Sequence, residues 1–426
     1  MLEIAILRNE KERVLTGLTK KNVSQGILDS INEIINLDDQ RKSVQSKLDE
    51  KLAESNNLAK IIGDLYKSGQ TEEANHNKIK VAELKEITKE LETELHSIKN
   101  MLEDKLYAVP NLPHSSVPSG KIPEDNEVFK AWDKPMPQLP ENALPHWELA
   151  DKYQVFDLKL GVKITGAGFP LYRGKGAKLQ RALIQFFLEE AIKAGYEEII
   201  PPLLVNESTA LATGQLPDKE GQMYYCEKDD LYLIPTAEVP VTNIYRDVLM
   251  EEKDFPVKMT GYTPCFRREA GSYGAHVKGL NRVHQFDKVE IVQIAHPAHS
   301  YRILDEMLAH VSSLLDKLEL PYRILRLCGG DMSFASALTF DFEVWSAAQE
   351  RWLEVSSVSN FETFQSNRMK LRYKDEMGKS KLAHTLNGSA LALARIMASI
   401  LENHQTPEGI RIPEALRPYT GFDFLT

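Results

Sequence analysis

The chain has 426 residues, of which 42% are hydrophobic, so we expect two or three domains with a sizeable buried core. Its formal net charge of −10 argues against indiscriminate nucleic-acid binding, which requires a broadly basic surface, but it leaves room for a local basic stripe. Three scattered cysteines without a CxxC pair predict neither a disulfide framework nor a cysteine zinc site, and no apolar run approaches the roughly 18 residues of a membrane span, so a reducing, cytoplasmic setting without a membrane partner is expected.

The first hundred residues contain two long helical patterns. After a short helix at residues 4–18, residues 27–66 contain no proline and place apolar side chains at helical intervals. A turn signal at residues 67–70 precedes residues 71–106, where apolar positions alternate spacings of three and four, as in a heptad seam. We therefore predict an antiparallel hairpin of two helices, each roughly 50 Å long at about 1.5 Å per residue.

Periodicity alone favours a dimerising coiled coil as the role of this hairpin. Residues 30–100 contain eleven basic and fourteen acidic residues, so the hairpin is not basic overall. Contacts with RNA would require a local stripe, and a solvated face of mixed charge is the simpler interpretation of each residue singly. The candidates for such a stripe are Arg41, Lys42, Lys60, Lys85 and Lys89.

Prolines recur throughout residues 107–150 and exclude a long helix or a central strand there. We interpret this stretch as an ordered linker that wraps onto a second domain, whose body begins near His146. The predicted domains are residues 1–108 and residues 109–426.

Residues 179–194 are amphipathic and predict a helix that ends at Gly195. Residues 197–205 predict a strand, in which Pro201 and Pro202 indicate an edge or an interface. Another strand begins at residue 231, and Thr236 and Glu238 at its end would share a face in extended chain. Taken alone, a Thr and a Glu in a loop usually face solvent or cap a turn.

Residues 259–295 predict a strand from 259 to 269, a polar loop and a second strand that starts near residue 282. Side chains alternate along a strand, so one polar face is expected. It would carry Arg267 and Glu269 on the first strand and Arg282, His284, Phe286, Lys288 and Glu290 on the second, with Val283, Val289 and Ile291 in the core. This face could simply be solvated, but arginines, carboxylates and a flat aromatic ring together favour a site for an anionic planar ligand such as a nucleoside triphosphate.

Two more stretches carry charges of interest. Residues 337–360 predict two strands, and the spacing of Glu354 and Ser357 puts them on opposite faces unless a bulge intervenes or the strand ends at Ser356. Residues 384–404 predict a helix entered through Asn387, Gly388 and Ser389. Arg395 is the only charge between residues 387 and 401 and must find an anion, either a ligand or a structural carboxylate.

Several of these stretches resemble one family. FRREAGSYG followed by GLNRVHQFDKVE is similar to motif 2 of class II aminoacyl-tRNA synthetases in its seryl-tRNA synthetase form. The proline-rich VPNLPHSSVPSG, Pro202 as the motif 1 proline, the TAE at residues 236–238 and Arg395 in motif 3 also match, so the resemblance covers essentially the whole chain. It implies an α+β fold: an N-terminal antiparallel helical hairpin that grips the variable arm of a tRNA, then a class II catalytic domain with a mostly antiparallel sheet flanked by helices.

The resemblance also implies a reaction. L-serine and ATP would give seryl-adenylate, and the seryl group would pass to the terminal ribose of tRNA(Ser), with charging of tRNA(Sec) left open. The implied enzyme is a cytoplasmic homodimer that joins through motif 1 and uses Mg²⁺, with no zinc. The implied serine-binding residues are Thr236 and Glu238 for the ammonium, Arg267 for the carboxylate, and Glu290 and Ser389 for the hydroxyl.

The implied ATP-binding residues overlap with these. Arg267 would also hold the α-phosphate, Glu269 the adenine amino group, and Arg282 the γ-phosphate region. Phe286 and Arg395 would clamp the nucleotide, with Arg395 on the γ-phosphate, and Glu354 and Ser357 would bind magnesium. Val283 completes the ATP set, and Arg267 and Arg395 are the implied catalytic residues. For Glu290 a plain salt bridge with Lys288 or Arg282 stays open.

Some positions depart from the family pattern. Ala390 and Ala394 stand where glycine is common, and Ala275 and His276 replace a usual charged pair in the motif 2 loop. Three other functions stay open: activation of an amino acid for a carrier protein, a catalytically inactive tRNA-binding or regulatory protein, and a coiled-coil interaction protein. The long hairpin opposes the first, the intact charged motifs oppose the second, and the third leaves residues 171–426 unexplained.

Overall fold

The computed structural model describes residues 1–218, 221–269 and 277–426. The chain divides into two compact units: one holds residues 2–19 and 23–110, and the other holds Met1, residues 20–22 and residues 111–426. Across the described residues, no helix combines the length and the apolar character that crossing a membrane requires.

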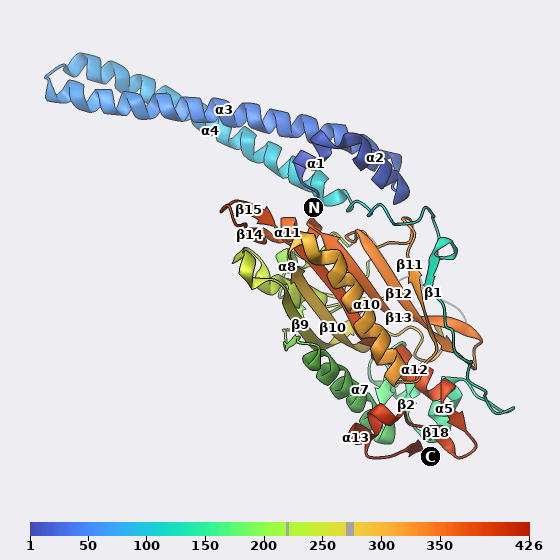
Figure 1. Cartoon of the computed structure of the whole chain (residues 1–426). Helices are drawn as coiled ribbons and strands as arrows, with labels where there is room; N and C mark the ends of the chain where they lie inside the picture. Colours follow the sequence, from blue (N-terminus) through green and yellow to red (C-terminus); the bar gives the residue numbers. More distant parts are fainter. Residues whose placement is uncertain (219–220, 270–276) are drawn as a thin grey trace. The chain divides into compact units, whose positions relative to one another are not determined.

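The first unit is the helical arm. Its helices are α1 (Ile4–Asn9), α2 (Lys11–Lys20, whose last residue falls outside the unit), α3 (Gln25–Lys67) and α4 (Thr71–Ala108). Helices α3 and α4 run side by side as the predicted antiparallel hairpin (Figure 1). The seam is apolar, with Val44 and Leu48 of α3 packed on Leu95 and Ile98 of α4.

The arm differs from expectation in two respects. The helix predicted at residues 4–18 is broken at Glu10 (φ −124°, ψ 35°), although no glycine or proline signals a break there. Arg41 and Lys42 both pair with Asp38 of their own helix, at 2.8 Å each. Burial raises the pKa of Asp38, but hydrogen bonds from Lys42, Arg41 and Arg8 outweigh it and lower the pKa to about 2. Two of the five candidate RNA contacts are thus engaged within the arm.

The second unit is built on an antiparallel sheet, as predicted (Figure 1). Among the described residues it has eight strands, and only β4 lies parallel to its neighbour, β9. In spatial order they are β1 (Glu127–Lys130), β11 (Tyr322–Arg326), β12 (Leu338–Ser346), β13 (Arg351–Glu362), β16 (His384–Ala392), β10 (Gln285–Ala295), β9 (Val257–Phe266) and β4 (Glu197–Glu198).

Helices pack on this sheet. The long helices α7, α10 and α12 share one hydrophobic core with the sheet, to which β10 contributes Val289 and Ile291 as predicted. Burial of such side chains is the main stabilising contribution of the domain. The helices are α5 (His146–Tyr153), α6 (Leu158–Ile164), α7 (Gly174–Lys193), α8 (Glu207–Thr213), α9 (Glu238–Thr242), α10 (Ser300–Lys317), α11 (Phe364–Met369), α12 (Leu393–Asn403) and α13 (Arg417–Thr420).

Short strands make four small sheets in the described part of this unit. One sheet is β2 (Phe156–Asp157) with β3 (Leu171–Tyr172), and another is β5 (Leu204–Val205), β7 (Leu231–Leu233) and β6 (Tyr225–Cys226). The remaining two are β15 (Ser380–Leu382), β14 (Arg372–Lys374) and β8 (Leu249–Glu251), and β17 (Gln405–Thr406), β18 (Gly409–Arg411) and β19 (Phe424–Leu425).

Two predicted elements differ from the structure, one in continuity and one in kind. The single strand predicted at residues 197–205 is two short strands, β4 and β5, in different sheets, because the prolines between them cannot donate ladder hydrogen bonds. The helix predicted at residues 384–404 begins only at Leu393. The preceding residues form β16, which pairs with both β10 and β13. Glycine suits position 388 because a Cβ there would lie only 3.1 Å from the Val358 side chain, which is tighter than an ordinary contact.

Candidate active site

A cavity of about 180 Å³ opens where the ends of β9 and β10 meet β13, β16 and the start of α12. Eight of the predicted site residues line it: Arg267, Glu269, Arg282, Val283, Phe286, Glu354, Ser389 and Arg395. The other lining residues are Leu280, Asn281, Lys288, Val355, Ser356, Ala392 and Ala394. The structure therefore gathers residues that are up to 128 positions apart in sequence, from Arg267 to Arg395, around one cavity.

The strands that carry the motif 2 residues are shorter than predicted. The first strand ends at Phe266 and the second begins at Gln285. Arg267, Glu269 and Arg282 therefore lie beyond the strand ends, and the predicted shared face applies only to Phe286, Lys288 and Glu290. Glu269 has a positive φ of 48°, which ends the strand geometry.

The charges at the strand ends still converge. The Arg267 guanidinium lies 5.3 Å from the centre of the Phe286 ring, and its Nε donates to the Pro235 carbonyl at 3.3 Å. The Glu269 carboxylate accepts from Arg282 at 2.8 Å. A cation over an aromatic face beside an exposed ion pair can receive an anionic group and a planar ring together.

Arg395 of α12 is held mainly by backbone. Its Nε donates to the Asn281 carbonyl at 2.9 Å and its Nη1 to the Glu354 carbonyl at 2.6 Å. The Glu354 carboxylate lies 3.6 Å away. The anion expected for Arg395 is thus a carboxylate of the protein, that of Glu354. At 3.6 Å the two groups form an ion pair that is longer than a normal hydrogen bond.

A β-bulge explains the spacing of Glu354 and Ser357. Glu354 pairs with Glu343 and Ser356 with Phe342, so Val355 is the extra residue and the bulge alternative is correct. The strand continues to Glu362, so the alternative that it ends at Ser356 is wrong.

Beside this bulge lies Asp341, directly across the ladder from Ser357. Burial and the charge of Glu354 raise the pKa of Asp341, opposed by a hydrogen bond with Ser357. Its Oδ1 is buried without a hydrogen-bond partner. Within the described ranges, no group of three or more His, Cys, Asp or Glu side chains could hold a metal, so Glu354 and Ser357 do not form a complete metal site by themselves.

The remaining serine-binding candidates, Thr236, Glu238 and Glu290, form a buried cluster. Lys288, which lines the cavity, contacts this cluster. Its Nζ lies 2.5 Å from the Glu290 carboxylate and donates to the Thr236 hydroxyl at 2.7 Å. Thr236 in turn accepts from the Glu238 backbone at 3.2 Å and lies 3.3 Å from Glu290. Burial, and then the charge of Glu290, raises the pKa of Glu238 to about 7.

The ion pair that the alternative interpretation of Glu290 required is therefore present, with Lys288 as the partner. Ser389 is the residue opposite Glu290 on the neighbouring strand, and its carbonyl accepts from Ser356 at 2.6 Å. Both Glu290 and Ser389 are buried.

Comparisons with known proteins cover both units. The family model of the seryl-tRNA synthetase N-terminal domain matches residues 1–113, and that of the tRNA synthetase class II core domain (G, H, P, S and T) matches residues 224–404. Over 99% of its length the chain is 49% identical to the serine–tRNA ligase of Salinibacter ruber, 98% of which is covered. The chain belongs to the seryl-tRNA synthetase family.

Two further seryl-tRNA synthetase relatives agree along their whole lengths. The serine–tRNA ligase of Methylacidiphilum infernorum is 44% identical, with all of both chains covered. The crystal structure of seryl-tRNA synthetase from Pyrococcus horikoshii complexed with ATP is 32% identical and superimposes with a TM-score of 0.89, covering 99% of each chain. The fold expected from the resemblance is confirmed.

Sequence reasoning placed Lys288 on the polar face and named it as a possible partner of Glu290, but assigned it no role in the site. A lysine between two carboxylate-bearing positions was the available signal. Of the departures from the family pattern, Ala394 lines the cavity and Ala390 is buried in β16. Ala275 and His276 lie outside the described residues.

Proposed function

We propose that this protein is a serine–tRNA ligase, which activates L-serine with ATP and transfers the seryl group to the terminal ribose of tRNA(Ser). The observation that carries the proposal is the identity of 49% with a serine–tRNA ligase over nearly the whole of both chains. The charged cavity and the adjoining buried cluster of Thr236, Glu238, Lys288 and Glu290 support it.

In the activation step, the serine carboxylate attacks the α-phosphorus of ATP and pyrophosphate leaves. No side chain is required as a nucleophile, because positioning and charge stabilisation carry this kind of transfer. Arg267 bridges the serine carboxylate and the α-phosphate, and Phe286 beneath it receives the adenine. Glu269 accepts from the adenine amino group, Arg282 and Arg395 hold the outer phosphates, and Val283 completes the ATP-binding set in the cavity lining.

Serine lies at the buried end of the cavity in this proposal. Its ammonium binds Thr236 and Glu238, and its hydroxyl binds Glu290 and Ser389. A carboxylate has about four acceptor positions, so Glu290 can accept the hydroxyl while it stays paired with Lys288. The internal ion pair is therefore compatible with a substrate role for Glu290.

Magnesium is the metal that these donors fit. The groups near the bulge are all oxygens. Beside them, the Oδ1 of Asp341 is buried without a hydrogen-bond partner, and the raised pKa of Asp341 is what a bound cation would lower again. Hard cations with oxygen ligands suit such a set better than zinc does. Glu354 and Ser357 would hold the ion, which would neutralise phosphate charge when bound.

A homodimer and a tRNA contact complete the proposal. Apolar side chains are exposed on both sides of Pro201 and Pro202 in the motif 1 region. Ile200 before them is 87% exposed, and Leu203 and Leu204 after them are exposed as well. An exposed apolar patch of this kind indicates an interface, here with a second copy of the chain. The helical arm binds tRNA(Ser), and the cytoplasm is the inferred location.

The test is charging of purified tRNA(Ser) with labelled serine. The full chain should charge it, and a variant lacking residues 30–100 should remain a dimer that makes seryl-adenylate but charges tRNA(Ser) poorly. Unimpaired charging by the deletion variant would contradict the role of the arm, a monomeric product would contradict dimerisation through motif 1, and no charging by the full chain would contradict the ligase itself. The same assay with tRNA(Sec) decides whether the chain charges that tRNA as well.

A further inference from the structure

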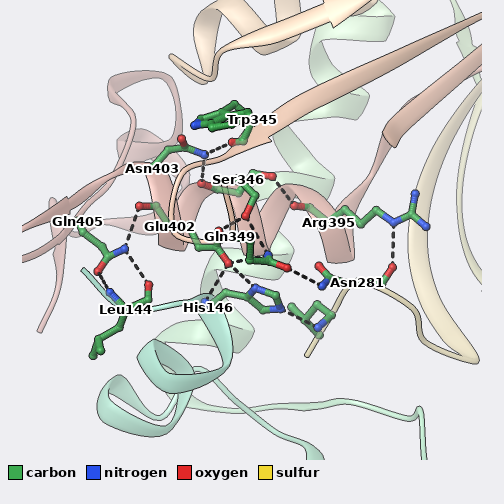
Figure 2. A network of polar contacts seen from close by, with 12 residues as sticks. Leu144, His146, Asn281, Trp345, Ser346, Gln349, Arg395, Glu402, Asn403 and Gln405 are labelled. Carbon is green, nitrogen blue, oxygen red and sulfur yellow. Dashed lines mark hydrogen bonds and ion pairs between the residues drawn. The ribbon is translucent and has the colours of Figure 1, made fainter. Parts of the chain in front are cut away.

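A buried polar network lies behind the cavity, around His146 of α5 and Glu402 of α12 (Figure 2). The His146 Nδ1 lies 2.7 Å from Glu402 Oε1, and the backbone N–H of His146 donates to the same oxygen at 3.0 Å. Both side chains are fully buried. Burial raises the pKa of Glu402, but the hydrogen bonds from His146 and Ser346 outweigh it and hold the pKa below its usual value.

The other nitrogen of His146 holds the chain where it returns from the motif 2 loop. The backbone N–H of Leu280 donates to His146 Nε2 at 2.9 Å, so this nitrogen is the acceptor and Nδ1 carries the proton given to Glu402. Gly279 packs directly against the ring: its φ is +71°, and a Cβ there would lie 2.1 Å from Nε2. The imidazole therefore fixes the backbone at residues 279–280.

A second branch of the network fixes the next residue (Figure 2). Gln349, in the turn between β12 and β13, donates to Glu402 Oε1 and to Ser346 Oγ at 2.9 Å each. Its own Oε1 accepts from Asn281 Nδ2 at 2.9 Å. The Asn281 carbonyl, held in this way, accepts from the Nε of Arg395 at 2.9 Å.

We propose that His146 and Gln349 are positioning residues that aim the Arg395 guanidinium into the cavity. Neither lines the cavity, whereas Leu280, Asn281 and Arg395 do. His146 holds the backbone N–H of Leu280, and Gln349 holds the side chain of Asn281, so residues 280–281 are anchored at two points. The Asn281 carbonyl in turn orients Arg395 through its Nε. Outer hydrogen-bond partners commonly control site residues in this way, and a displacement of about 1 Å can cost a hundredfold in rate. The inference rests on the proposed role of Arg395 in binding ATP.

The chain offers a matched pair of glutamines for the test. Gln349→Met removes the bonds to Asn281, Ser346 and Glu402. Gln405→Met is the control, because Gln405 also makes three hydrogen bonds near α12, to Leu144 and to the Glu402 carbonyl, but none to the loop return. Both glutamines are half-buried, so similar losses of thermal stability are expected.

The measurement is the Kd of ATP by calorimetry, with the KM of serine in pyrophosphate exchange as the second readout. Gln349→Met should weaken ATP binding about tenfold, in the range typical of lost outer partners. Gln405→Met should bind ATP as the unaltered protein does, and the KM of serine should stay within about twofold in both. Equal ATP affinity in the two variants would overturn the proposal.

Two substitutions at His146 provide a second test. His146→Gln can place an amide oxygen where Nε2 accepts from Leu280, whereas His146→Asn keeps only a donor near Glu402. ATP affinity should fall in the Asn variant and recover in the Gln variant, and the reverse order would contradict the proposal. If either variant does not fold, the glutamine pair decides. ATP binding without serine-dependent exchange would reject the proposed function but not the positioning role, and absence of ATP binding by the unaltered protein would reject both.

Discussion

The two ends of the cavity hold charge in opposite ways. At the open end, Arg282 and its partner Glu269 are 47% and 17% exposed, and Arg395 (27% exposed) lies 3.6 Å from the Glu354 carboxylate (50% exposed). At the closed end, Lys288 and Glu290 are 6% and 3% exposed and lie 2.5 Å apart.

This difference has an energetic consequence. Exposed ion pairs contribute only about 0–1 kcal/mol, so the open end can exchange its internal partners for phosphate groups at little cost to the fold. A buried charge without its partner costs about 3–5 kcal/mol, so the closed end must stay internally satisfied. We infer that the open end serves binding of ATP, and that the closed end serves selection of serine. Four predictions test this division.

Glu290→Ala should collapse the preference for serine over alanine. A site that accepts a substrate hydroxyl can reject the analogue without it by about 10⁴-fold, because the acceptor position that takes the hydroxyl is left without a donor, even though Glu290 keeps Lys288 as its ion-pair partner. Without Glu290 that penalty vanishes, whereas the KM for ATP should change little. The readout is kcat/KM for serine and for alanine in pyrophosphate exchange. An unchanged ratio would assign Glu290 only to the salt bridge with Lys288.

Lys288→Met should destabilise the domain by about 3–5 kcal/mol, because it leaves the buried Glu290 charge without its partner. Arg282→Met is the matched change at the open end and should cost less than about 1 kcal/mol, as expected for an exposed pair. Urea unfolding monitored by circular dichroism compares the two. Equal losses of stability would remove the distinction between the ends.

Arg267→Ala should lower the rate of adenylate formation by a factor equivalent to about 3 kcal/mol, or more than a hundredfold, because it removes a charge contact to the reacting phosphate. Arg268→Ala is the neighbouring control. Arg268 is exposed, stacks on Tyr224 at 5.6 Å and does not line the cavity, so its loss should leave the rate near normal. Single-turnover kinetics with folded protein measure both. Near-normal adenylation by Arg267→Ala would refute the assigned role.

Serine binding should weaken below pH 7. Burial raises the pKa of Glu238 to about 7, so its carboxylate becomes protonated as the pH falls through this value and can no longer pair with the serine ammonium. The KM for serine should therefore rise, by up to about tenfold per pH unit below 7, while the KM for ATP follows a different profile. In Glu238→Gln the serine KM should be high and independent of this titration. A flat serine KM between pH 8 and 6 in the unaltered protein would exclude ionised Glu238 as the ammonium partner.

Sequence periodicity predicted the elements that are regular over many residues. The hairpin α3–α4 and the inward positions Val289 and Ile291 of β10 are regular enough for period alone to place them. The prediction of a helix over residues 384–404 is wrong for the first half, because a short apolar run suits a buried strand and a helix equally well. Pairing of residues 384–392 with two neighbouring strands decides that they form a strand.

The candidate site was predictable in composition but not in geometry. Resemblance brought Arg267, Glu269, Arg282 and Arg395 together, but their position beyond the strand ends depends on where ladder pairing stops. The bulge at Val355 depends on the register of two strands, which the sequence does not encode locally. The sequence leaves the partnership of Lys288 with Glu290 as one of two alternatives, because two charges two positions apart can face either water or one another.

The most direct test of the account is ATP–pyrophosphate exchange by the purified protein with each of the twenty amino acids in turn. Serine is predicted to support exchange far better than any other, with alanine lower by about 10⁴-fold as expected for a site that must satisfy a buried carboxylate. Preference for another amino acid over serine would contradict the assignment of the closed end, and with it the proposed function.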